Sequence, residues 1–150
     1  MSYAKGCKNE SHVKIIASVL RTEGFNVSID GGSIGRRLDE RKIEALEDAA
    51  VIVICVSKKY HELANEEANY AKGLEKIGQA QVLYTMLDET YTTDSQPFRV
   101  NGWLGNMVFG TTWYPCWTKF QAQSTAIEIA SNIMRTVDLK VINQLRSKGK

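Results

Sequence analysis

Six consecutive apolar residues, VIVICV at positions 51–56, constrain the fold of this chain more than any other feature. Five of the six are β-branched, and such residues favour β-strands. A run without polar alternation is typical of a strand that is covered on both faces, as strands of parallel sheets are. The run therefore predicts an inner strand of a parallel sheet with helices on both sides.

Predicted helices and strands alternate along the rest of the chain. Apolar periodicity and turn residues predict helices over residues 11–23, 38–49, 60–77 and from 125 onward, and strands over residues 2–4, 25–29, 51–56, 81–87 and 111–117. Ser11 or Asn9 is available to cap the first helix. Strict alternation implies successive βαβ units, so residues 1–150 are expected to form one doubly wound α/β domain.

The last predicted helix has a start signal of its own. Thr125 and Glu128 have the spacing of a capping box, in which each side chain bonds the backbone N–H of the other residue. The apolar stripe predicted for this helix consists of Ile127, Ala130, Ile133, Met134 and Val137.

Charge and cysteine content narrow the classes of function. A net charge of +2 falls short of the concentrated basic surface of a nucleic-acid binder, so no nucleic-acid partner is expected. Cys7, Cys55 and Cys116 are too widely spaced to indicate a disulfide framework or a zinc site. No apolar stretch approaches the roughly 18 residues of a membrane span, and no signal peptide is evident. A cytoplasmic location with reduced thiols is therefore expected.

Sheet topology predicts where a ligand would bind. In doubly wound sheets the crevice lies beyond the carboxyl ends of the strands, where the winding reverses. Residues 4–6 follow the predicted first strand and residues 56–57 end the central one, so they are expected to line this crevice. The helix predicted over residues 60–77 begins beside it.

One acid on that helix differs from its neighbours in position. Glu62 and Glu66 share a polar face with Asn69 and Gly73, as expected of solvated residues. Glu67 instead belongs to an otherwise apolar stripe that contains Leu63, Tyr70, Leu74 and Ile77. A carboxylate there must be paired or must face a cleft, because burial of an unsatisfied charge is costly. Two structural explanations remain open: an ion pair with Lys5 or Lys58, or a favourable interaction with the helix N-terminus.

Several stretches together resemble a TIR domain, the Toll/interleukin-1 receptor fold, and most of all its stand-alone and effector modules. They are SYAKGCKNESHVKIIASVLRTEGFNVSID, GGSI, ALEDAAVIVICVSKKY, EANYA, NGWLG and FGTTWYPCW, which run in this order from the start of the chain to residue 117. The resemblance implies a flavodoxin-like, five-stranded parallel sheet in the order 2-1-3-4-5, with the first strand shortened at Met1.

The resemblance implies one of two functions. Some TIR domains cleave NAD+ at the nicotinamide–ribose bond with one glutamate, which corresponds to the Glu67 of EANYA; NAD+ is then the substrate, and no cofactor or metal is needed. Others act as signalling scaffolds by associating with further TIR domains. A weaker third reading is a related nucleoside-processing enzyme such as a deoxyribosyltransferase. Rigid counting from Ser57 would put Asn69 at the catalytic position, whereas helical phase favours Glu67.

The resemblance also implies roles for other residues. Those expected to bind substrate are Ala4, Lys5, Asp30, Ser57 and Tyr60. Those expected to form a loop for TIR–TIR contacts are Gly31, Gly32, Ser33, Ile34 and Gly35, although this loop with its two following arginines is also compatible with a phosphate cradle or a simple tight turn. The lone histidines, His12 and His61, are predicted to be exposed, and the three tryptophans to lie in the core or at its rim.

Overall fold

A parallel sheet forms the centre of the domain. The computed structural model describes residues 1–29, 38–89, 102–108 and 111–148. Its sheet contains β1 (Val51–Val56), β2 (Gln81–Met86) and β3 (Trp113–Pro115) in that order, and both neighbouring pairs are parallel. Residues 52–56 are buried, which confirms the prediction made from the VIVICV run.

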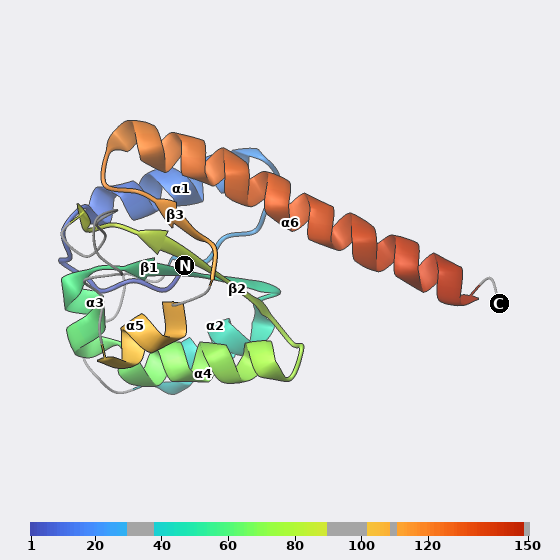
Figure 1. Ribbon diagram of the computed structural model, residues 1–150, viewed down its shortest axis with the longest axis horizontal. Helices are drawn as coiled ribbons and strands as arrows, with labels where there is room; N and C mark the ends of the chain where they lie inside the picture. Colours follow the sequence, from blue (N-terminus) through green and yellow to red (C-terminus); the bar gives the residue numbers. More distant parts are fainter. Residues whose placement is uncertain (30–37, 90–101, 109–110, 149–150) are drawn as a thin grey trace.

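Helices cover both faces of this sheet. Figure 1 shows α1 (Glu10–Thr22) and α6 (Lys119–Lys148) on one face, and α2 (Glu40–Asp48), α4 (Asn65–Lys76) and α5 (Gly102–Val108) on the other. The short α3 (Lys58–Leu63) follows the carboxyl end of β1, and α6 extends well past the rest of the domain (Figure 1). Within the described ranges, no helix combines the length and the apolar character that a membrane crossing requires.

The first two predicted strands form only a trace of sheet. Ser2 makes a single parallel bridge to Ile54, in which Ser2 N donates to Val53 O at 2.8 Å and Cys55 N donates to Ser2 O at 2.8 Å. Residues 25–29 alternate in burial as predicted but form no strand. A strand needs an extended partner backbone, and residues 2–4 beside this segment form only isolated bridges, at Ser2 and Ala4. The described residues therefore form three strands where the resemblance implies five.

The helix predicted over residues 60–77 is broken in two. Ala64 leaves helical geometry, with φ −106° and ψ 24°, and separates α3 from α4. Ser57 caps α3, since its hydroxyl accepts the Tyr60 N–H at 3.1 Å. As a result, Glu66 and Glu67 lie in the first turn of α4 instead of in the middle of a long helix.

The break also corrects the predicted apolar stripe. The face of α4 that packs on the sheet consists of Ala68, Ala71 and Leu74. Ile77, the last member of the predicted stripe, is 72% exposed. The prediction gave weight to large apolar residues, whereas small alanines allow this helix to approach the sheet closely. Glu67 lies beside the buried face and not on it.

The start of α6 also differs from the prediction. The capping box is formed by Thr118 and Gln121: Gln121 N donates to the Thr118 hydroxyl at 3.1 Å, and Thr118 N donates to Gln121 Oε1 at 3.1 Å. Thr125 lies inside the helix and its hydroxyl donates to Pro115 O at 2.6 Å. The face of α6 that packs on the domain consists of Ala122, Ala126, Ile129, Ala130 and Ile133. Ile127 and Met134 of the predicted stripe lie off this face and are exposed, and the side chain of Val137 lies outside the described residues.

Polar side chains close the carboxyl edge of the sheet. Asn9, the N-cap residue of α1, donates from Nδ2 to Leu87 O at 2.7 Å instead of capping the helix. His12 is buried, with Nδ1 2.8 Å from Cys116 O, so the prediction that it is exposed was wrong.

His61 is half-buried and meets Trp103 edge to face, with ring centroids 5.5 Å apart. All three tryptophans are partly buried against the core, and all three cysteines are buried and free.

Candidate functional site

Glu67 is the one predicted catalytic residue, and it lines a cavity. Its side chain is 12% exposed and projects from the first turn of α4. The cavity has a volume of about 620 Å³, which falls within the usual range for small-molecule sites. The carboxylate is therefore neither directed to bulk water nor packed in a dry interior without space beside it.

The cavity lies along the first half of β1, and residues 4–6 and 56–57, which were expected to line a crevice beyond the carboxyl ends of the strands, are not among its lining residues. One wall is the strand edge at Val51, Ile52 and Val53, and the opposite wall is the extended segment formed by residues 25–28. Helix α2 contributes Lys42, Ala45 and Leu46, and the other face of the sheet contributes Leu20 and Ile133. Most of this surface is apolar. The side chains that are charged at neutral pH among the described lining residues are Lys42, Asp48 and Glu67.

Lys42 is a charged partner of Glu67 among the described residues. Its Nζ lies 3.9 Å from Glu67 Oε2, and its side chain is 19% exposed. This distance is too long for a hydrogen bond, so the two charges attract each other without fixing each other's geometry. The sequence was compatible with an ion pair between Glu67 and Lys5 or Lys58, and in the structure a lysine of α2 lies beside Glu67. The helix N-terminus provides the second stabilising influence that was foreseen.

Tyr60 connects the first segment of the chain to α3. It is fully buried, and its hydroxyl lies 2.8 Å from Ser2 Oγ. Burial raises the pKa of Tyr60 well above its usual value, and the negative charge of Glu67 raises it further. The phenol therefore stays protonated and serves as a hydrogen-bonding group that supports the bridge between Ser2 and β1.

The other predicted substrate-binding residues that the structure describes do not line this cavity. Ala4 and Ser57 are buried at the carboxyl end of the sheet, where Ser57 acts as a helix cap. Lys5 is exposed and lines a separate hollow with Lys14 and Arg21 of α1. Asp30 and the loop over residues 31–35 lie outside the described residues. Glu67 is therefore the only predicted site residue among the described lining residues of the cavity.

Sequence reasoning missed Lys42, although a signal was present. Lys42, Ala45, Leu46 and Ala49 all line the cavity, and they follow one another at intervals of three, one and three residues. This spacing places them on one face of a helix. A single lysine on an otherwise apolar helical face is the same kind of pattern that identified Glu67.

Comparison with known families agrees with the arrangement of the sheet and helices. A family model described as TIR domain matches residues 1–110, a stretch that includes Lys42, Tyr60 and Glu67. No curated protein and no solved structure matches the chain.

Proposed function

This chain belongs to the TIR domain family, and from that premise we propose that it cleaves NAD+ at the nicotinamide–ribose bond, with Glu67 as the essential carboxylate. The observation that carries the proposal is a largely shielded carboxylate at the wall of a mostly apolar cavity. The products would be nicotinamide and ADP-ribose, or a cyclic form of ADP-ribose. The proposal includes the family's five-stranded sheet order, with residues 2–4 and 25–29 as its first two strands.

The reaction suits a single carboxylate. Cleavage of the bond to cationic nicotinamide develops positive charge on the ribose, while the leaving group departs as a neutral base and needs no general acid. An anion held beside the sugar stabilises this charge in the transition state more than in the substrate. The apolar walls strengthen the effect, because charges interact more strongly where water is excluded.

The structure favours Glu67 over the alternative at Asn69. The Asn69 side chain is exposed, and its Nδ2 donates to Asn65 Oδ1 one turn earlier at 2.7 Å. It is therefore a surface residue of α4, whereas Glu67 lines the cavity. An amide also lacks the negative charge that the developing cation requires.

The test is nicotinamide release from NAD+ by the purified chain, followed by chromatography that also identifies the second product. We expect turnover by the natural protein and its loss in Glu67→Gln, which keeps the size and shape of the side chain. Glu62→Gln is the matched control, since Glu62 is an exposed glutamate of α3. Absence of turnover by the natural protein over a wide range of protein concentrations would refute the proposal.

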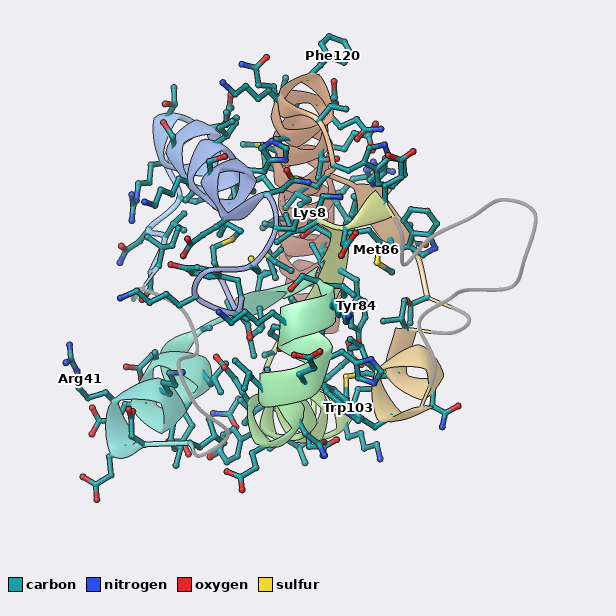
Figure 2. The ribbon with its side chains drawn as sticks, turned by 90° about the vertical axis from the view of Figure 1, so that its left-hand side faces the viewer. Lys8, Arg41, Tyr84, Met86, Trp103 and Phe120 are labelled. Carbon is teal, nitrogen blue, oxygen red and sulfur yellow. The ribbon has the colours of Figure 1, made fainter. Side chains whose placement is uncertain are left out.

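An exposed apolar surface of α6 supports a second candidate function, which is association between copies of this chain. Phe120, Ile127 and Met134 are 77%, 57% and 44% exposed and are spaced seven residues apart, which places them on one side of the helix. Figure 2 shows Phe120 pointing outward from the start of α6. Because TIR domains associate with one another, we propose that this α6 stripe contacts a second copy of the chain.

This second candidate predicts a mass that depends on concentration. Light scattering coupled to size-exclusion chromatography should show a dimer that shifts toward the monomer in Ile127→Ser, the centre of the α6 stripe. Glu128→Gln, an exposed change on the same helix about 100° around the helix axis from Ile127, is the control. A monomer at every concentration would refute association through this surface.

A further inference from the structure

Lys42 has unused hydrogen-bonding capacity inside the cavity. A lysine ammonium carries three N–H donors. Four fifths of this side chain is shielded from solvent, yet Nζ donates no hydrogen bond to a described residue, and its ion-pair contact is the one to Glu67 at 3.9 Å. A largely buried ammonium with unfilled donors is suited to an anionic ligand that enters the cavity.

Two helices hold Lys42 and Glu67 at this separation. The Asp39 carboxylate caps α2 by accepting the Lys42 N–H at 2.9 Å, which fixes the backbone from which the lysine projects. Glu67 projects from the first turn of α4. The two charges therefore approach the cavity from separate elements and can contact different parts of one ligand.

We propose that Lys42 binds the phosphate on the 5′ carbon of the reacting ribose, so that its contact with Glu67 is exchanged for one with substrate. The inference rests on the proposed function, because it assigns the phosphate end of the same substrate. In NAD+ a single ribose lies between the bond that Glu67 would act on and the 5′-phosphate that Lys42 would bind. Lysine is well suited to this task as a compact point charge. The substrate class is thereby narrowed to nucleotides, and nucleosides are excluded as good substrates.

Kinetics distinguish phosphate binding by Lys42 from a role in which Lys42 only positions Glu67. If Lys42 only orients Glu67, its loss lowers kcat for every substrate that Glu67 cleaves. If Lys42 binds phosphate, its loss raises KM for a substrate that has the phosphate and leaves one without it unaffected. NAD+ and nicotinamide riboside contain the same scissile bond and differ in this respect.

The experiment compares KM and kcat for both substrates in Lys42→Gln, Lys42→Met and Lys42→Arg. We expect KM for NAD+ to rise about tenfold or more in the first two variants, the size expected for one lost charged hydrogen bond. Lys42→Arg should keep KM for NAD+ close to that of the natural protein. KM for nicotinamide riboside should show no comparable change in any of the three variants. Arg41→Gln is the matched control, because Arg41 points away from the domain (Figure 2). Equal losses on both substrates, or no loss on NAD+, would overturn the inference.

Binding separates this inference from the proposed function. Isothermal calorimetry with ADP-ribose requires no turnover, so it reports on Lys42 even if the natural protein does not cleave NAD+. We expect binding that weakens about tenfold in Lys42→Gln and is retained in Arg41→Gln. ADP-ribose binding that is equal in the natural protein and Lys42→Gln, or absent from both, would refute the assignment whatever the outcome of the cleavage assay.

Discussion

Oε2 of Glu67 and Nζ of Lys42 lie 3.9 Å apart at the wall of one cavity, and each side chain is more than four fifths shielded from solvent. A pair at this distance has the attraction of opposite charges without the directional hydrogen bond of a tight ion pair. The arrangement stabilises a carboxylate in an apolar setting and leaves N–H donors of the Lys42 ammonium available to an anionic ligand. The proposed phosphate contact of Lys42 depends on those donors.

The buried hydrogen bond between the hydroxyl groups of Ser2 and Tyr60 predicts that Tyr60→Phe is less stable than the natural protein. The change leaves Ser2 Oγ buried without its partner, so the free energy of unfolding should fall by about 1–3 kcal/mol. Urea denaturation measures this. Tyr70→Phe is the matched control, since the Tyr70 hydroxyl donates to Glu47 at the exposed surface and its loss should have a smaller effect. Similar losses in the two variants would contradict the structural role of Tyr60.

The capping box at the start of α6 predicts a second stability change. Thr118→Ala removes the hydroxyl that accepts the Gln121 N–H, and the expected cost is about 1 kcal/mol. Thermal unfolding followed by circular dichroism should show a lower midpoint for this variant and no shift for Thr112→Ala, an exposed threonine outside the helix. An unchanged midpoint in Thr118→Ala would show that the cap is not needed.

The sheet was predictable because its strongest signal is local. A continuous apolar run of mostly β-branched residues, such as VIVICV, favours a strand, and its lack of polar residues indicates two covered faces. The ends of helices were less predictable. Two threonines near the start of α6 are each followed three residues later by a glutamine or a glutamate: Thr118 by Gln121, and Thr125 by Glu128. Packing against β3 decides which of the two pairs begins the helix.

The candidate site was predicted in part, for a similar reason. Glu67 was identified by assuming one helix over residues 60–77, but the break at Ala64 gives α4 a different buried face. The residue lines a cavity nonetheless, because the first turn of α4 faces α2. Lys42 could not be paired with Glu67 from the sequence, since 25 positions separate them and only the packing of α2 against α4 brings them together.

The buried thiols predict weaker stability in alkaline solution. Burial raises the pKa of Cys55 from its usual 9.0 to about 11 and that of Cys116 to about 12. An acid whose pKa is higher in the folded state contributes stability that is complete below pH 9 and is lost as the pH rises toward 11, because the unfolded chain ionises first. At pH 10 the expected loss is about 1 kcal/mol for each thiol.

Urea denaturation at pH 8 and pH 10 measures this loss, and Cys55→Ala tests its origin. The variant lacks one of the two thiols, so its stability should fall less than that of the natural protein between the two pH values, although it is less stable at pH 8. An identical fall in both proteins would mean that Cys55 ionises as readily in the folded chain as in the unfolded one.

The most direct test of the central claim is the ratio of kcat for NAD+ cleavage between the natural protein and Glu67→Gln, measured beside Glu62→Gln. The Glu67 carboxylate should contribute about 10²- to 10³-fold, as expected of one preorganised charge in the transition state. We therefore predict a drop of that size in Glu67→Gln at an unchanged thermal midpoint, and full activity in Glu62→Gln. Turnover by Glu67→Gln at the rate of the natural protein would contradict the account.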